Sequence, residues 1–163
     1  QLEELRTEVS VQVFNWQGEL ISSHTATAQI PANEAGYVAT WSEQELLQGK
    51  ASPEEVVVML SCDHLEIERN LYYLRSPREL ELPAATWAAT INEQEQTITI
   101  QNGDVLTRML RIDIEQGRLR MSDNYFDLLP GEERVVTIRH AGGEPVRFDT
   151  LRISAWNGDV GEE

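Results

Sequence analysis

The chain has 163 residues with 28 acidic and 13 basic side chains, which gives a formal charge of −15. This excess of negative charge opposes binding to nucleic acid and to anionic membrane surfaces, because both draw their affinity from Lys and Arg. The hydrophobic share of 40%, with four Trp, is typical of a folded chain. No apolar run approaches the roughly 20 residues that span a bilayer, so we expect neither a nucleic-acid nor a membrane partner.

The single cysteine, Cys62, excludes an internal disulfide framework. The Glu-rich start of the sequence does not have the pattern of a signal peptide, and no Asn stands two residues before Ser or Thr as in a glycosylation site. These features favour a reducing compartment, and we expect the cytoplasm of a bacterium.

The chain opens with the period of two that is typical of half-buried strands. Residues 9–13 alternate strictly between apolar and polar side chains, and residues 20–30 alternate more loosely. Between them, Gln17-Gly18 predicts a tight turn, so the two segments are expected to form a hairpin. Tyr37 and Trp41 continue the alternation and are expected to share an interior face.

The next segment contains one predicted helical turn and two predicted strands. Ser42 to Glu45 has the spacing of a capping box, and Gly49 would end the helix that it begins. The continuous apolar run 56–60 predicts a strand that is covered on both faces, followed by a strand within 66–74. Residues 76–83 lie between two prolines and are expected to form a connection.

The strand pattern resumes in the second half with residues 87–91 and 96–101. Asn102-Gly103 then predicts a two-residue hairpin turn, because both central positions of such a turn need positive φ. Residues 106–115 alternate regularly between apolar and polar side chains. Arg108 is the exception, because it occupies a position where the pattern predicts an apolar residue.

Further short strands follow around Leu119 and over residues 125–129. Pro130-Gly131 predicts a type II turn, which leads directly into a strand at residues 135–138. The last predicted strand covers residues 150–156, after a pair of glycines.

Turn signals that recur about every ten residues between short strands indicate β-sandwiches. The halves on either side of residue 79 each carry several predicted strands. We therefore predict an all-β chain with two tandem immunoglobulin-like sandwich domains, covering residues 1–79 and 80–163.

The segment Ser122–Glu132 resembles the signature of the C-terminal immunoglobulin-like domain of β-mannosidases of glycoside hydrolase family 2. Asn70–Leu74, with the Pro-containing linker behind it, resembles the end of the preceding domain, and Phe14–Leu20 resembles that domain's opening hairpin. Exo-acting β-glucosaminidases of the same family have similar tail domains, so the sugar preference stays open. The resemblance implies a structural role for the motif residues Asp123, Asn124, Tyr125, Phe126, Asp127, Pro130 and Gly131.

Enzymes of that family use two glutamates on a TIM-like barrel, in the retaining arrangement. Such a barrel needs about 250 residues of repeating strands and helices, which this sequence does not contain. The resemblance thus implies non-catalytic accessory domains whose partners are the catalytic and N-terminal domains of a parent β-mannosidase. The alternative is an independent carbohydrate-binding or adhesion-type sandwich.

Two groups of residues are candidates for a site. Asp123, Asn124 and Asp127 could supply oxygen ligands to Ca²⁺, but the regular calcium-loop spacing is absent, and bonds from these side chains to nearby backbone are the simpler interpretation. The three histidines are not joined by motif to a nucleophile and an Asp. We therefore expect no catalytic residue, no metal and no cofactor.

Phe14 and Trp16 form the second group. If the alternating valines of residues 9–13 face the core, these two aromatic side chains lie on the opposite face as an exposed apolar pair. An exposed pair of this kind indicates contact with another domain, and weak glycan binding is the alternative.

The family's first tail domain has strand sequence ahead of the segment that Leu5–Val13 resembles, so we expect the first domain to lack its opening strand. Residues 9–13 would then form an unpaired edge without charge. Such an edge favours self-association, because strand addition satisfies a whole row of backbone groups.

Overall fold

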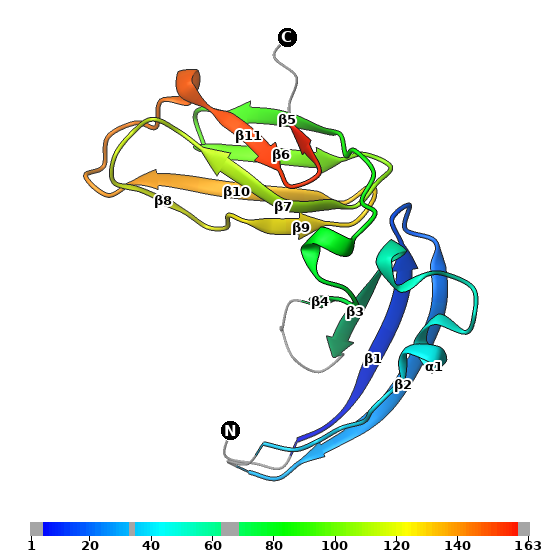
Figure 1. Cartoon of the computed structure of the whole chain (residues 1–163). Helices are drawn as coiled ribbons and strands as arrows, with labels where there is room; N and C mark the ends of the chain where they lie inside the picture. The colour runs from blue at the N-terminus through cyan, green and yellow to red at the C-terminus, as the bar shows by residue number, and fades with distance from the viewer. Residues whose placement is uncertain (1–4, 33–34, 63–68, 160–163) are drawn as a thin grey trace. The chain divides into compact units, whose positions relative to one another are not determined.

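The computed structural model describes residues 5–32, 35–62 and 69–159 (Figure 1). The described part consists almost entirely of antiparallel strands, which confirms the predicted all-β class. The chain divides into two compact units, residues 1–81 (unit 1) and residues 82–163 (unit 2).

Unit 1 contains a four-stranded sheet in the order β2-β1-β3-β4, in which a long hairpin of β1 and β2 is prominent (Figure 1). Its strands are β1 (Leu5–Asn15), β2 (Leu20–Ile30), β3 (Val56–Cys62) and β4 (Asn70–Tyr73). The helix α1 (Glu43–Leu47) and the 3₁₀ turn η1 (Pro53–Glu55) precede β3, and the 3₁₀ turn η2 (Pro77–Glu79) follows β4.

The predicted turn between β1 and β2 is confirmed. Gly18 has a φ of +80°, and its N–H donates to the carbonyl of Asn15 at 3.0 Å. The side-chain oxygen of Asn15 also accepts the N–H groups of Gln17 and Glu19, at 3.1 and 2.9 Å. One Asn side chain thus holds the turn closed.

The expectation of an unpaired edge at residues 9–13 is wrong. All five residues pair with β2 on one side and with β3 on the other, so their backbone groups are occupied on both edges. The reason is that β3 returns antiparallel along β1 after α1, which places β1 inside the sheet. Strand addition at residues 9–13 therefore gives no basis for self-association.

The core of unit 1 lies between one face of the sheet and α1. Leu46 and Leu47 of α1 are buried and pack with valines of β1 and β3. The capping box begins α1 as predicted, because the Ser42 side chain accepts the Glu45 N–H while the Glu45 carboxylate accepts the Ser42 N–H at 2.7 Å. The Ser42 hydroxyl also donates to the Glu45 carboxylate at 2.7 Å, and this bond, together with the one from the Ser42 N–H, lowers the pKa of Glu45.

The expectation that Tyr37 and Trp41 share an interior face is confirmed for Trp41 and wrong for Tyr37. Trp41 packs against the core of unit 1, but Tyr37 is 83% exposed and neither residue belongs to a strand. Alternation fixes the direction of side chains only where the backbone pairs in a sheet. Here the chain is a connection that leads into α1.

Unit 2 is a sandwich of two four-stranded sheets, β5-β6-β10-β8 (sheet A) and β12-β11-β7-β9 (sheet B) (Figure 1). Side chains from both sheets form one buried core. The strands of sheet A are β5 (Trp87–Asn92), β6 (Thr97–Asn102), β10 (Glu133–His140) and β8 (Leu119–Met121). The strands of sheet B are β12 (Gly158–Asp159), β11 (Arg152–Ala155), β7 (Thr107–Asp113) and β9 (Phe126–Leu128), and the 3₁₀ turn η3 (Phe148–Thr150) precedes β11.

Asn102-Gly103 is not a hairpin turn, because β6 and β7 belong to different sheets. The Asn102 side chain is buried, and it donates to three backbone carbonyls and accepts the Thr107 hydroxyl at 2.5 Å. At Gly103 an added Cβ would lie 2.6 Å from Oγ1 and 2.8 Å from the carbonyl oxygen of Thr86. Both residue types are thus required by a crossing between the sheets, and not by a two-residue turn.

The exception at Arg108 in the alternating pattern marks a β-bulge. Thr107 pairs with Leu128 and Leu110 pairs with Phe126, so two residues of β7 lie opposite one residue of β9. At the bulge Thr107 is fully buried, and Arg108 is half-buried with its guanidinium 5.8 Å from the ring centroid of Trp156.

The end of unit 2 is fastened to its beginning by Asn157. The Nδ2 group of Asn157 donates to the carbonyls of Pro83 and Leu106, at 2.9 and 2.8 Å, and its Oδ1 accepts the Arg108 N–H at 3.0 Å. Its backbone carbonyl accepts the Ala85 N–H at 2.8 Å. One residue near the C-terminal strand therefore joins two earlier segments, residues 83–85 and residues 106–108.

Candidate binding site at the strand that changes sheets

Residues 119–128 run as one stretch that starts in one sheet of unit 2 and ends in the other. β8 pairs with β10 in sheet A, whereas β9 pairs with β7 in sheet B. The residues between β8 and β9 are Ser122 to Tyr125, which open the sequence motif. The motif is therefore the crossing between the two sheets.

Two side chains replace strand pairing at this crossing. The Ser122 Oγ accepts the Thr137 N–H at 3.0 Å, while the Ser122 N–H donates to the Thr137 carbonyl at 2.9 Å. Asn124 Oδ1 accepts the Ile112 N–H at 2.8 Å, and Asn124 Nδ2 donates to the Ile112 carbonyl at 2.9 Å. Ser122 thus holds sheet A and Asn124 holds sheet B.

The two aspartates of the motif have partners inside unit 2. Asp123 accepts from the Arg134 guanidinium at 2.7 Å, and that guanidinium lies 5.2 Å from the ring centroid of Phe126. Asp127 Oδ1 accepts the N–H of Met109 in the bulge at 2.7 Å. Within the described residues, no group of three or more His, Cys, Asp or Glu side chains is placed to hold a metal ion.

The turn at Pro130-Gly131 ends the motif. Gly131 has a φ of +71°, and the Glu132 N–H donates to the Leu129 carbonyl at 3.1 Å, which is the hydrogen bond of a type II turn. The Gly131 N–H donates to the carbonyl of Gly103 at 2.9 Å. The turn therefore also fastens the crossing between β6 and β7.

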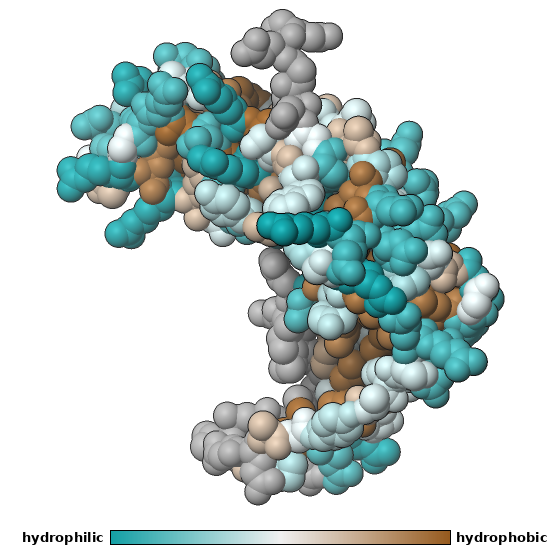
Figure 2. Space-filling view, in the orientation of Figure 1, coloured by the Kyte–Doolittle hydropathy of each residue, from teal (hydrophilic) through white to brown (hydrophobic). Residues whose placement is uncertain are grey.

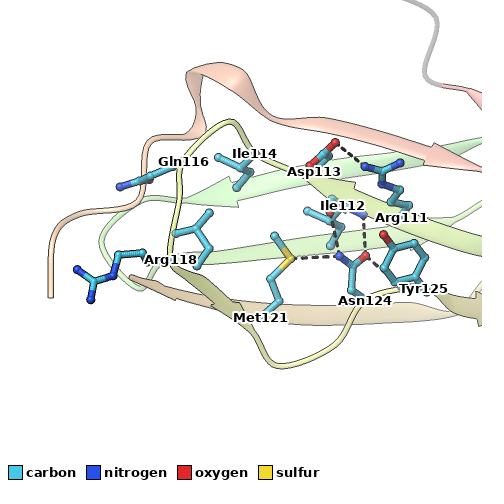
Figure 3. A pocket seen from close by; sticks show the side chains of 10 residues that line it. Arg111, Ile112, Asp113, Ile114, Gln116, Arg118, Met121, Asn124 and Tyr125 are labelled. Carbon is cyan, nitrogen blue, oxygen red and sulfur yellow. Dashed lines mark hydrogen bonds and ion pairs between the residues drawn. The ribbon is translucent and has the colours of Figure 1, made fainter. Parts of the chain in front are cut away.

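A hollow of about 510 Å³ opens where the stretch leaves the first sheet (Figure 3). It lies between the end of β7 and β8, and it is bordered by the core residues Ile112 and Ile114 and by the half-buried Leu119 and Met121. Figure 2 shows hydrophobic residues reaching the surface between hydrophilic ones at this end of unit 2. Its volume lies within the roughly 300–1,000 Å³ that small-molecule sites occupy, but its exposed surface is more polar than apolar, unlike that of most such sites.

Polar and aromatic side chains surround the hollow. Arg111 and Asp113, on outward positions of β7, form an ion pair at 2.8 Å. Tyr125 is 54% exposed and lies beside Asn124 (Figure 3). Arg118 forms no ion pair with any residue of the described ranges, and in Figure 3 its side chain points outward from the β7–β8 loop.

Two further polar residues at the hollow are already occupied. Both side-chain atoms of Gln116 bond to backbone, its Oε1 accepting the Arg147 N–H at 2.9 Å and its Nε2 donating to the Pro145 carbonyl at 3.1 Å. Asn124 holds Ile112 in the same way. Of the other polar side chains around the hollow, Arg111 and Asp113 pair with each other, Arg118 points away, and Tyr125 is exposed (Figure 3).

Sequence reasoning named Tyr125 only as part of the motif, and it did not find Arg111 or Asp113. Charged residues at outward positions of an alternating strand are usual on any solvated face. These two residues border a hollow because β8 belongs to the other sheet, and nothing local in the sequence signals which sheet a strand joins.

Phe14 and Trp16 lie differently from the expected exposed pair. Trp16 is only 3% exposed, and its ring centroid lies 6.2 Å from that of Tyr73. Phe14 is half-buried and pairs with Leu20 of β2. The exposure expected for Trp16 is wrong because β1 shifts register just before Phe14 and ends before Trp16, so strand alternation no longer sets the direction of that side chain.

Comparisons with protein families agree with this architecture. Residues 1–79 match the model of the mannosidase Ig/CBM-like domain, and residues 80–153 match that of an Ig-fold domain. The chain belongs to the mannosidase-type families of immunoglobulin-like domains, one domain in each half. In this mannosidase-type chain the motif from Ser122 to Glu132 forms the crossing between the sheets and the turn at Pro130-Gly131.

Solved structures similar to the mannosidase-type domains are much longer proteins. The β-D-mannosidase of Dictyoglomus thermophilum matches with a TM-score of 0.63 and 16% identity, over 98% of this chain and 19% of that one. The exo-chitosanase of Amycolatopsis orientalis matches with a TM-score of 0.50 and 16% identity, over 98% of this chain and 24% of that one. A comparison with curated protein sequences finds no match.

The chain therefore spans about one fifth to one quarter of the length of these structural neighbours. At this level of identity the likeness concerns the fold alone. In the part of the chain that the structure describes, no helix is long and apolar enough to cross a membrane.

Proposed function

We propose that these two domains are the non-catalytic accessory domains of a retaining β-mannosidase of glycoside hydrolase family 2. The observation that carries this proposal is the order of the two family matches, which together cover residues 1–153. A β-mannosidase among the structural neighbours, matched over 98% of this chain, supports the same proposal. In this role the domains pack against a catalytic barrel that lies elsewhere in the parent polypeptide.

The hydrogen bonds of the motif's side chains favour a structural, non-catalytic role. The carboxylates of the motif bond to an arginine and to backbone, as an architectural element requires. Phe14 and its strand partner Leu20, which is 54% exposed, offer an apolar contact surface in unit 1. We assign this pair to contact with another domain of the parent enzyme.

The test compares the isolated chain with the parent enzyme. The coding region around this sequence is expected to contain a strand–helix barrel with two catalytic glutamates. The complete polypeptide should hydrolyse aryl β-mannosides, and the isolated chain should not hydrolyse them. A coding region without such a barrel would overturn the proposal, as would hydrolysis that stays with the isolated chain through purification.

A second experiment tests the contact assigned to Phe14 and Leu20. In the complete enzyme, Leu20→Ser should lower the melting temperature of the barrel more than Tyr37→Ser does. Tyr37 is the matched control, since it is an exposed apolar side chain of the same unit. Equal effects of the two substitutions would remove Leu20 from the interface.

A further inference from the structure

We propose that the free edge of β2 pairs with the same edge of a second copy of this chain, so that the two unit 1 sheets join antiparallel into one. We call residues 23–28 the β2 edge. In the described residues β2 is a border strand of its sheet and pairs only with β1 (Figure 1). The inference does not depend on the proposed function.

The first argument is that β2 carries none of the usual features that protect a border strand. Natural sheets protect their borders with charged side chains, Pro, β-bulges or very short strands. β2 has 11 residues without a single Asp, Glu, Lys, Arg or Pro, although 25% of the whole chain is charged. Its pairing with β1 is regular from Ser22 to Ile30. The β2 edge therefore offers a regular row of backbone donors and acceptors.

The second argument is that unit 1 covers only the beginning of β2. The Lys50 ammonium donates to the Ile21 carbonyl at 3.3 Å, and the Ser22 hydroxyl donates to the Leu46 carbonyl. Along the β2 edge, within the ranges that the structure describes, the backbone hydrogen bonds of the strand reach no segment other than β1.

The third argument compares β2 with the other border strands of the described sheets. β4, β8, β9 and β12 have only two to four residues each, and β5 has six. Strand addition satisfies backbone groups in proportion to the length of the strands that pair. Addition at β2 therefore gains the most hydrogen bonds.

The charge of the chain points to a second copy as the occupant. At a net charge of −15, most contacts between two copies bring carboxylates together, whereas β2 contributes none. A two-fold axis through Thr25 places the two Thr25 side chains opposite each other and Ser23 opposite Thr27. All three side chains are exposed, and hydroxyl pairs of this kind stabilise antiparallel strands.

The experiment is sedimentation velocity of the whole 163-residue chain from micromolar to millimolar concentration. A reversible dimer is expected, with a dissociation constant of tens of micromolar. Thr25→Lys should raise this constant at least about tenfold, because the axis brings two ammonium groups together. Since Thr25 is exposed, the melting temperature of the dilute variant should not change. Hydrogen exchange should slow in residues 23–28 as the dimer forms.

Thr90→Lys is the matched control, because it places the same charge at an exposed Thr of β5, the next longest border strand. It should leave the dissociation constant unchanged. A chain that stays monomeric at millimolar concentration would overturn the proposal. So would equal effects of the two substitutions, or slowed exchange that lies outside β2.

The test separates this inference from the proposed function. If the complete enzyme hydrolyses mannosides while the isolated chain is monomeric, pairing at the β2 edge is refuted and the accessory role stands. If the chain forms a dimer that Thr25→Lys dissociates while its coding region contains no barrel, the β2 edge is supported and the accessory role falls.

Discussion

The side-chain amide of Asn124 bonds both backbone groups of Ile112, donating to the carbonyl at 2.9 Å and accepting the N–H at 2.8 Å. A neighbouring strand would offer a donor and an acceptor in the same way, and an amide is a side-chain group that can replace both. Because of this relationship, the chain can cross from β8 to β9 while the backbone N–H and carbonyl of Ile112, in the core strand β7, keep hydrogen-bond partners.

Asn124→Asp should therefore destabilise unit 2, because the carboxylate keeps the acceptor but loses the donor to Ile112. A partly buried carbonyl left without its donor costs roughly 1–3 kcal/mol. Asn92→Asp is the matched control, since Asn92 uses only its Oδ1, which accepts the N–H groups of Gln94 and Glu95. Urea unfolding of both variants measures the difference, and equal midpoints would show that the Nδ2 bond does not contribute.

Gly103→Ala should also destabilise unit 2. The new Cβ would meet the carbonyl oxygen of Thr86 at 2.8 Å, and this backbone atom cannot move without disturbing its bond to the Gly103 N–H. Overpacking of this kind costs about 1–3 kcal/mol. Gly117→Ala is the control, because no atom lies within 4 Å of a Cβ at that position. A melting temperature of Gly103→Ala at or above that of the control would contradict the close approach.

Gly131→Val tests the turn by strain alone, since open space surrounds a Cβ at that position. The φ of +71° should cost a valine roughly 1–2 kcal/mol or more, and Gly131→Asn should cost less. Thermal unfolding followed by circular dichroism orders the two variants. The opposite order would mean that the turn does not keep its positive φ in solution.

The capping box of α1 should make unit 1 sensitive to acid. Hydrogen bonds from the Ser42 side chain and backbone hold the pKa of Glu45 below its ordinary value of 4.5. A lowered folded-state pKa stabilises the fold above the unfolded-state value, and this contribution disappears as the pH falls through the folded-state value.

Glu45→Gln should therefore lower the melting temperature at neutral pH and have little effect well below pH 4.5. Glu93→Gln, in an exposed turn of unit 2, serves as the control. A difference between wild type and Glu45→Gln that persists undiminished in acid would show that the carboxylate charge is not the cause.

The sequence predicted the elements whose signals are local. Alternation located β1 and β2, the Ser42–Glu45 spacing located α1, and Pro130-Gly131 located a turn with positive φ. Each of these rests on residues that are close together in the chain, so a pattern of neighbouring side chains is sufficient.

The misassigned residues are those whose environment is made by distant segments. Asn102-Gly103 has the composition of a hairpin turn, yet its conformation is set by Thr86, Thr107 and the end of β9. Trp16 is buried beside Tyr73 of β4, and the hollow between β7 and β8 lies between strands of two different sheets. Such relationships depend on topology, which periodicity does not encode.

The bonds of Asn157 have a consequence for how unit 2 is made during protein synthesis. Leu106, Pro83 and the backbone of Ala85 find these partners only in a residue that is translated 51 or more positions later. Until Asn157 has left the ribosome, residues 83–85 and 106–108 lack these hydrogen bonds. A nascent chain that stalls before this residue should therefore stay sensitive to protease over residues 83–108, and release of a few more residues should protect the whole unit at once.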